Sequence, residues 1–239
     1  MDRSSQTTFL QLGDASIHTS FTPAVRPRPD GLTLVILHGA GQSSSQRFTA
    51  FSKTFTAAGI PVAALDFIGH GKTGGNTHDN SLQLRTQHAL AAIAHWTKPA
   101  APLILCGSSM SGHTALQVAS ELGERVKSLC LLQPAVYAAE AQNIAFGPEF
   151  TSILRQAGSW QSSPALQDAR RFMGKALVMI GGEDAVIPWG VIEALVNNFK
   201  QSARQTRLEV FSGVGHELPT WLPEHPMHCQ QLLDYLLDE

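Results

Sequence analysis

The sequence has few cysteines and almost no net charge, and each shortage excludes a class of protein. It contains 3 cysteines in 239 residues, and its formal net charge is −2. Three widely separated cysteines do not form a disulfide framework. A nearly neutral chain has no overall field that would attract nucleic acid or an anionic membrane. We therefore expect no nucleic-acid partner, and any ligand has to be inferred from a particular site.

Long apolar runs are also missing. No run approaches the roughly 20 residues of a membrane-spanning helix. Residues 1–6 lack the charged-then-apolar order of a secretory signal. These absences predict a cytoplasmic protein with no membrane span. Cys106 and Cys130 lie inside short apolar runs, where a thiol behaves as a small buried hydrophobic group.

The sequence does contain a regular alternation of short apolar runs and helical periodicity. Residues 8–12 and 15–21 flank Gly13-Asp14, a pair that favours a tight hairpin turn. Further strands are expected at 32–37, 62–65, 103–106, 126–132, 175–180 and 208–211, and helices at 48–58, 88–96, 111–122, 189–199 and from about 230. This order predicts a single α/β domain over residues 1–239, with a mostly parallel, doubly wound sheet and an antiparallel N-terminal hairpin.

One stretch interrupts the alternation. Between the strands expected at 126–132 and 175–180, helical spacing occurs at 138–143 and 149–156, and 158–164 has the composition of a loop. An insertion after a strand of a parallel sheet lies over the crevice where such sheets bind ligands. We therefore expect a small lid at about 137–172; the alternative is an ordinary crossover with an extra turn.

The strongest motif is Gly107-Ser108-Ser109-Met110-Ser111-Gly112, which follows a predicted strand and opens a predicted helix. A serine on such a strained turn has its hydroxyl above the edge of the sheet, with the next backbone N–H directed at a developing oxyanion. The alternative is a serine that only caps the helix.

Three more segments follow predicted strands. His38-Gly39-Ala40-Gly41 precedes the serine motif, and Gly181-Gly182-Glu183-Asp184 and Gly213-Val214-Gly215-His216 come after it. A carboxylate at a strand end can hydrogen-bond a histidine, and the glycines let a histidine loop approach closely. Glu183 is the nearest competitor for the acid, and Asp184 could instead be an exposed turn residue.

Together these segments resemble the α/β-hydrolase family of serine hydrolases, over roughly residues 30–237. The serine motif departs from the family pattern G-x-S-x-G, since Ser111 stands at the second glycine and Gly112 comes one residue later. The resemblance implies Ser109 as nucleophile, His216 as general base and Asp184 as the acid that orients it. It also implies an oxyanion hole formed by the backbone N–H groups of Ala40 and Met110. Some members of the family carry the acid after the preceding strand. The corresponding position here is near Gln133, which is not a carboxylate.

No cofactor and no metal are expected. His225, His228 and Cys229 lack a complete set of four ligands and are predicted to lie at the surface. His38 and His70 are expected to shape their loops, and His113 is expected in the interior of a helix.

The substrate is less well defined than the reaction. Candidate pocket residues are mostly large and apolar: Gly39, Phe67, Tyr137, Phe146, Phe150, Leu154, Trp160, Trp189 and Leu218. They favour an apolar acyl or aryl ester of small to moderate size, or a thioester. Three alternatives stay open. The first is amide or peptide cleavage, with Glu140 or Glu149 binding a substrate amine. The others are carbon–carbon bond hydrolysis and a slow-turnover or non-catalytic small-molecule binding protein. The sequence contains no heptad or interface stripe from which an oligomeric state could be predicted.

Overall fold

The structure is a computed structural model that describes residues 5–238. The predicted domain limits at residues 1 and 239, and residues 1–4 of the stretch considered for a secretory signal, lie outside this range. Within it, no helix is long and apolar enough to cross a membrane.

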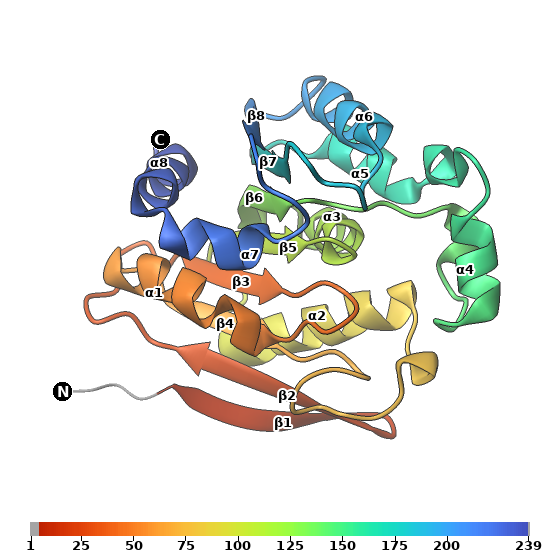
Figure 1. The fold of residues 1–239 in the computed structure, drawn as a ribbon. Coiled ribbons are helices and arrows are strands. Elements are labelled where there is room, and N and C mark those ends of the chain that lie inside the picture. Colours follow the sequence, from red (N-terminus) through yellow and green to blue (C-terminus); the bar gives the residue numbers. More distant parts are fainter. Residues whose placement is uncertain (1–4, 239) are drawn as a thin grey trace.

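Eight strands form one sheet in the order β1-β2-β4-β3-β5-β6-β7-β8 (Figure 1). They are β1 Gln6–Leu12, β2 Ala15–Thr22, β3 Thr33–Leu37, β4 Val62–Leu65, β5 Leu103–Ser108, β6 Val126–Leu132, β7 Lys175–Gly181 and β8 Gln205–Phe211. Strand β2 pairs antiparallel with β1 and with β4, and the other pairs are parallel. The predicted α/β sheet with its N-terminal hairpin is therefore confirmed.

Helices cover both faces of the sheet. They are α1 Thr49–Ala57, α2 Leu82–Trp96, α3 Ser111–Leu122, α4 Pro148–Leu154, α5 Pro164–Arg171, α6 Trp189–Phe199, α7 Leu218–Trp221 and α8 Pro226–Leu237. One core lies between the sheet and α2, α3, α5 and α6; the other lies between the sheet and α1, α7 and α8. Every residue of β3 is buried, as its continuous apolar run predicts.

Two helices begin earlier than their apolar spacing predicts. Helix α2 starts at Leu82 rather than at residue 88, because Ser81 caps it by accepting a hydrogen bond from Leu84 N at 3.2 Å. Helix α8 starts at Pro226, a residue suited to the first helical turn.

The stretch between β6 and β7 is helical, and its parts differ in position. Helix α4 stands apart from the sheet, on the side toward which β3 points (Figure 1). Helix α5, which was not predicted from the sequence, packs Leu166 and Ala169 into the core beside α6. Residues 158–164, expected as a loop, contain a 3₁₀ turn at Ser159–Ser162.

Strand order reverses direction at β3, which lies between β4 and β5. The carboxyl ends of β3 and β5 therefore lie side by side at a switch point, where open α/β sheets bind ligands. Strand β3 leads into His38 and Gly39, and β5 leads into Ser109.

Candidate active site

Ser109 occupies a strained turn between β5 and α3. Its φ is +50°, and Ser109 and Gln133 are the only non-glycine residues with positive φ in the described chain. The turn is held by its own backbone: Ser109 N donates to Leu132 O at 2.9 Å, and Ser109 O accepts from Gly112 N and Ala135 N at 2.8 and 2.9 Å. Such a conformation persists only when surrounding contacts fix it.

The departure from the family pattern has a steric explanation. A Cβ on Gly112 would lie 2.5 Å from Cβ of Pro134, so this position has no room for a side chain. Ser111 is fully buried, and its hydroxyl donates a hydrogen bond to His38 O. The tight approach to the next loop thus occurs at Gly112, and position 111 accepts a serine.

His216 and Asp184 are brought to Ser109 from the ends of β8 and β7. His216 Nδ1 lies 2.8 Å from Asp184 Oδ2, and His216 Nε2 lies 2.9 Å from Ser109 Oγ. Since Nδ1 faces a carboxylate it carries the proton, and Nε2 is left to accept from the serine. The Asp184 side chain is fully buried, whereas that of His216 is 25% exposed.

The carboxylate of Asp184 is kept ionised by its hydrogen bonds. Burial acts to raise its pKa, but the hydrogen bonds from His216 and from the N–H groups of Ile187 and Val186 outweigh burial and lower it. The two N–H groups reach Oδ1 at 3.1 and 2.8 Å. Asp184 is therefore an anion that holds His216 in one orientation. Glu183, the competing acid, is exposed.

Gln133 is a residue of the candidate site that was not predicted from the sequence. It follows β6 with φ +50°, and its Nε2 donates to Asp184 Oδ2 and to Gly215 O, both at 2.6 Å. Its Oε1 accepts from Leu218 N at 3.0 Å. Gln133 therefore fixes both the acid and the loop that carries His216. Its place at the end of a strand was a signal, but only a carboxylate was expected to act from that place.

The loop after β3 approaches Ser109 closely. A Cβ on Gly39 would lie 3.1 Å from Cβ of Ser109. His38 Nδ1 donates to Gly39 O at 2.7 Å, and Nε2 accepts from Phe67 N at 3.1 Å. Burial, followed by the charges of Arg85 and His70, holds the pKa of His38 well below its ordinary value, so its ring is neutral. In residues 5–238 the N–H groups of Ala40 and Met110 donate to no protein acceptor.

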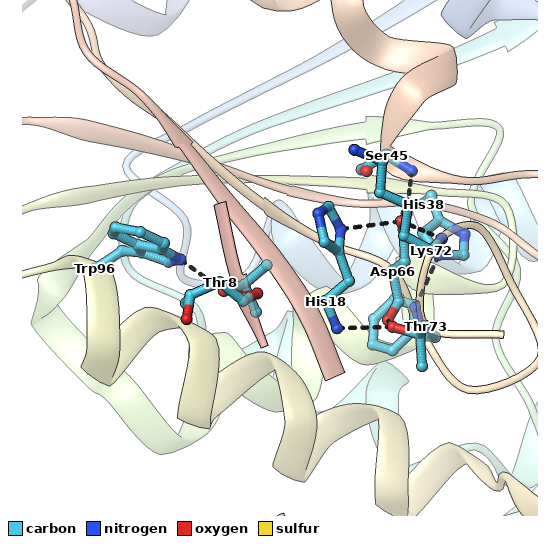
Figure 2. A network of polar contacts seen from close by, with 10 residues as sticks. Thr8, His18, His38, Ser45, Asp66, Lys72, Thr73 and Trp96 are labelled. Carbon is cyan, nitrogen blue, oxygen red and sulfur yellow. Dashed lines mark hydrogen bonds and ion pairs between the residues drawn. The ribbon is translucent and has the colours of Figure 1, made fainter. Parts of the chain in front are cut away.

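Figure 2 shows a buried carboxylate, Asp66, that accepts hydrogen bonds beside the His38 loop. Asp66 accepts from Ser45 N at 2.7 Å, from Lys72 N at 2.9 Å and from His18 Nδ1 at 3.2 Å. Thr73 Oγ1 donates to Asp66 O and accepts from His18 N. These contacts tie the segment that follows the His38 loop to the hairpin strand β2.

The predicted pocket residues separate into three groups. Phe146, Phe150 and the half-buried Tyr137 form an apolar cluster with Met110, the residue after Ser109. Trp160 packs beside Gly190, while Leu154 and Trp189 are 36% and 47% exposed. Phe67 and Leu218 are wholly buried at 0% exposure, so the structure assigns them to packing rather than to a surface open to substrate.

The other histidines and cysteines lie as follows. His113 is buried and bonded to Gln142 Oε1 and Tyr137 N, as expected, and His70 Nδ1 bonds Ile68 O in its own loop. The surface position predicted for Cys229 is wrong: it is 3% exposed, because α8 turns it into the core. His225 and His228 stack on Trp221. In the described residues no three His, Cys, Asp or Glu side chains are grouped to hold a metal ion.

Comparisons with known proteins give matches in sequence and in fold. Residues 28–163 match the family Serine aminopeptidase, S33 (Hydrolase_4). A monoacylglycerol lipase of Mycolicibacterium smegmatis is 30% identical over 138 residues, which are 56% of this chain and 48% of the lipase. The chain thus matches about half the length of that relative.

Solved structures share the whole fold at low identity. An esterase from Exiguobacterium antarcticum superposes with a TM-score of 0.70 at 20% identity, covering 98% of this chain and 100% of the esterase. The thioesterase domain from the curacin biosynthetic pathway gives 0.72 at 17% identity, covering 97% and 100%. With a family match over more than half its length and this fold, the chain belongs to the S33 serine aminopeptidase family of α/β-hydrolase-fold serine hydrolases.

Proposed function

We propose that the protein cleaves a carboxylic ester, or a thioester, through a covalent acyl-enzyme. The observation that carries the proposal is the hydrogen-bonded chain from Ser109 Oγ through His216 to Asp184. His216 Nε2 takes the serine proton as Oγ attacks the acyl carbon, and Asp184 stabilises the resulting imidazolium. His216 then returns the proton to the departing alcohol or thiol. Water repeats the attack and releases the acid.

The oxyanion hole in this proposal consists of the N–H groups of Ala40 and Met110. Both lack a protein acceptor, and both adjoin residues in close contact, Gly39 and Ser109. The Gly39 carbonyl is held by His38, so the Ala40 N–H, on the opposite side of the same planar peptide, is held too. Donors fixed in advance stabilise developing charge without reorganisation.

An apolar acyl group fits the surroundings best. The cluster of Met110, Phe146 and Phe150 includes the residue that follows the proposed nucleophile, and these three side chains carry no charge. A lipase and an esterase among the similar proteins also support ester cleavage. In this proposal, residues 137–163 of the predicted lid at 137–172 cover the acyl group. Helix α5, in the rest of that segment, packs into the core. We retain the predicted cytoplasmic location and absence of a cofactor as further predictions.

The test is steady-state hydrolysis of p-nitrophenyl esters and acyl thioesters of graded chain length by wild type and Ser109→Ala. We expect repeated turnover, abolished in the variant, with the highest kcat/KM for an acyl chain of small to moderate length. A single burst without turnover would instead support a slow-turnover binding protein. Exclusive activity on a vinylogous diketone would support carbon–carbon bond hydrolysis.

A second candidate is aminopeptidase activity, which the family description names. Glu140 and Glu149 lie exposed in the helical segment after β6, where a carboxylate could bind a substrate amine. Aminoacyl p-nitroanilides test it directly. Turnover of these anilides that falls in Glu140→Gln or Glu149→Gln would favour the peptidase over the esterase.

A further inference from the structure

Arg85 is a buried cation that the proposed reaction does not use. It lies in the first turns of α2 with 0% exposure, and its guanidinium carbon sits 3.7 Å above the Phe67 ring. It forms no ion pair with a carboxylate in residues 5–238, and its Nε and Nη1 have no hydrogen-bond partner there. Burying a charge without a counter-ion is costly, and burial lowers the pKa of Arg85 to about 9. Such a cost is typically tolerated where a site needs the group.

The remaining nitrogen of Arg85, Nη2, donates two hydrogen bonds. Nη2 donates to His38 O at 2.5 Å and to Ser111 Oγ at 2.7 Å. Ser111 Oγ in turn donates to His38 O at 2.6 Å. These three groups form a closed triangle that joins helix α2, the start of α3 and the end of β3. Ser111 is the residue that replaces the family glycine, so a hydroxyl is present where the usual pattern has none.

The triangle acts on the peptide that leads into the proposed oxyanion hole. Arg85 and Ser111 hold the carbonyl of His38, and the His38 ring holds the carbonyl of Gly39. Two consecutive peptide planes are therefore fixed at their oxygens. Because each peptide is planar and trans, the direction of the Ala40 N–H follows from the position of Gly39 O.

We propose that Arg85 and Ser111 are positioning residues that hold the loop at residues 38–41 against the turn that carries Ser109, an inference that rests on the proposed hydrolase function. Both side chains are fully buried, so we expect them to act through the loop rather than on the substrate. Their contribution is geometric, since a displacement of about 1 Å in a catalytic group can lower a rate by about 10²-fold. The positive charge behind the loop also favours negative charge on the acyl oxygen.

The experiment compares wild type with Ser111→Ala, Ser111→Gly and Arg85→Met, and with Arg125→Met as the control. Arg125 is a part-buried arginine that also donates to backbone carbonyls, Ala101 O and Lys98 O, but it lies before β6 at the other end of the sheet. Three quantities are measured: kcat and KM for an ester, the Ki of a phenylboronic acid that forms a tetrahedral anion on serine, and amide hydrogen exchange of peptides covering residues 38–41.

We expect kcat to fall about 10- to 100-fold in the Ser111 and Arg85 variants while KM changes less than about threefold. The boronate Ki should rise in step with the fall in kcat, and exchange in residues 38–41 should become faster. Arg125→Met should leave all three unchanged. Should Arg85→Met fail to fold, the two Ser111 variants decide the question.

Folded Ser111 and Arg85 variants with wild-type kcat, Ki and exchange would overturn the inference. A wild-type protein without any turnover would refute the proposed function instead. The exchange measurement separates the two failures, because it reports the order of the loop without requiring catalysis.

Discussion

At the scale of single residues, backbone strain is concentrated at the proposed active site. Ser109 and Gln133, the two non-glycine residues with positive φ in the described chain, follow neighbouring strands β5 and β6. Several hydrogen bonds hold each residue in place. The backbone of Ser109 bonds Leu132, Gly112 and Ala135. The side chain of Gln133 bonds three polar groups. The structure therefore places its least favourable conformations where side chains must be aimed.

Removing the side-chain amide of Gln133 should impair both catalysis and stability. In Gln133→Leu, Gly215 O and Leu218 N lose a buried partner, and Asp184 loses one of its donors. We expect the free energy of unfolding to fall by about 1–3 kcal/mol and kcat to fall about tenfold or more.

Urea unfolding and ester kinetics measure the two effects. The control is Gln117→Leu, which removes a glutamine bonded to Thr86 and Gln142, away from the triad. Equal kcat values in the two variants would contradict the role given to Gln133.

Gly112 should tolerate no side chain. In Gly112→Ala the new Cβ meets Pro134 at 2.5 Å, so the turn after Ser109 or the loop after Gln133 must move. We expect the free energy of unfolding to fall by about 1–3 kcal/mol. We also expect kcat to fall by a larger fraction of its wild-type value than the free energy of unfolding does. Gly190→Ala, in the first turn of α6 where only the Trp160 ring is near, serves as the control. Melting temperatures and kcat check both; an unaltered Gly112→Ala would be inconsistent with the packing described.

At the scale of elements, the sequence predicts most of the sheet because its strands are buried on both faces. Strand β6 and helices α3 and α6 have the predicted bounds, since continuous apolar runs and helical spacing both end at clear turn residues. The start of α2 and all of α5 were not predicted, because a polar cap and a mixed polar helix carry little apolar periodicity.

In the candidate site, too, some residues could be predicted from the sequence and others could not. The four strand-end segments could be found from sequence, and the structure brings Ser109, Asp184 and His216 within hydrogen-bond reach. Gln133 carried a signal only in its place at the end of a strand, and Arg85 carried none. The partners of both residues, such as Gly215 O and His38 O, are supplied by distant segments of the chain. The complete burial of Phe67 also could not be read from the sequence.

The segment around α4 should control acyl-chain selectivity. Phe150 packs on Phe146 and Tyr137 in the apolar cluster that includes Met110. In Phe150→Ala we expect a larger cavity beside the proposed nucleophile, and the ratio of kcat/KM for octanoyl to acetyl p-nitrophenyl ester should rise several-fold. Leu166→Ala, in α5 and facing the main core, controls for general loosening. A ratio that is unchanged in Phe150→Ala, or that rises equally in Leu166→Ala, would count against a lid role.

At the scale of the whole molecule, two cores on opposite faces of the sheet enclose several neutral histidines. Burial lowers the pKa of His88 and of His113 from 6.5 to about 4, with Arg85 adding to the effect at His88. The unfolded chain therefore binds protons that the folded protein does not bind between about pH 6.5 and 4. Stability must fall as pH decreases through that window. The lowered pKa of Asp184 adds a further loss below about 3.8.

This linkage predicts acid-sensitive unfolding. A shift of one pKa unit corresponds to about 1.4 kcal/mol, so we expect each histidine to account for about 2 kcal/mol lost between pH 7 and 4.5. His88→Leu removes one titrating group whose Nδ1 has no partner, and it should flatten the dependence. The exposed His95 on the same helix, changed to Leu, is the control. Urea unfolding at several pH values gives the slopes, and equal slopes in all three proteins would rule out this origin.

Covalent labelling with a fluorophosphonate, mapped by mass spectrometry, tests whether Ser109 is an activated nucleophile. We expect one adduct, on Ser109, because His216 and Asp184 are placed to activate that hydroxyl. The adduct should be absent in Ser109→Ala and strongly reduced in His216→Ala, with Ser108→Ala labelled like wild type. An unlabelled wild type, under conditions in which a known serine hydrolase is fully modified, or an adduct on Ser108 instead, would contradict this expectation.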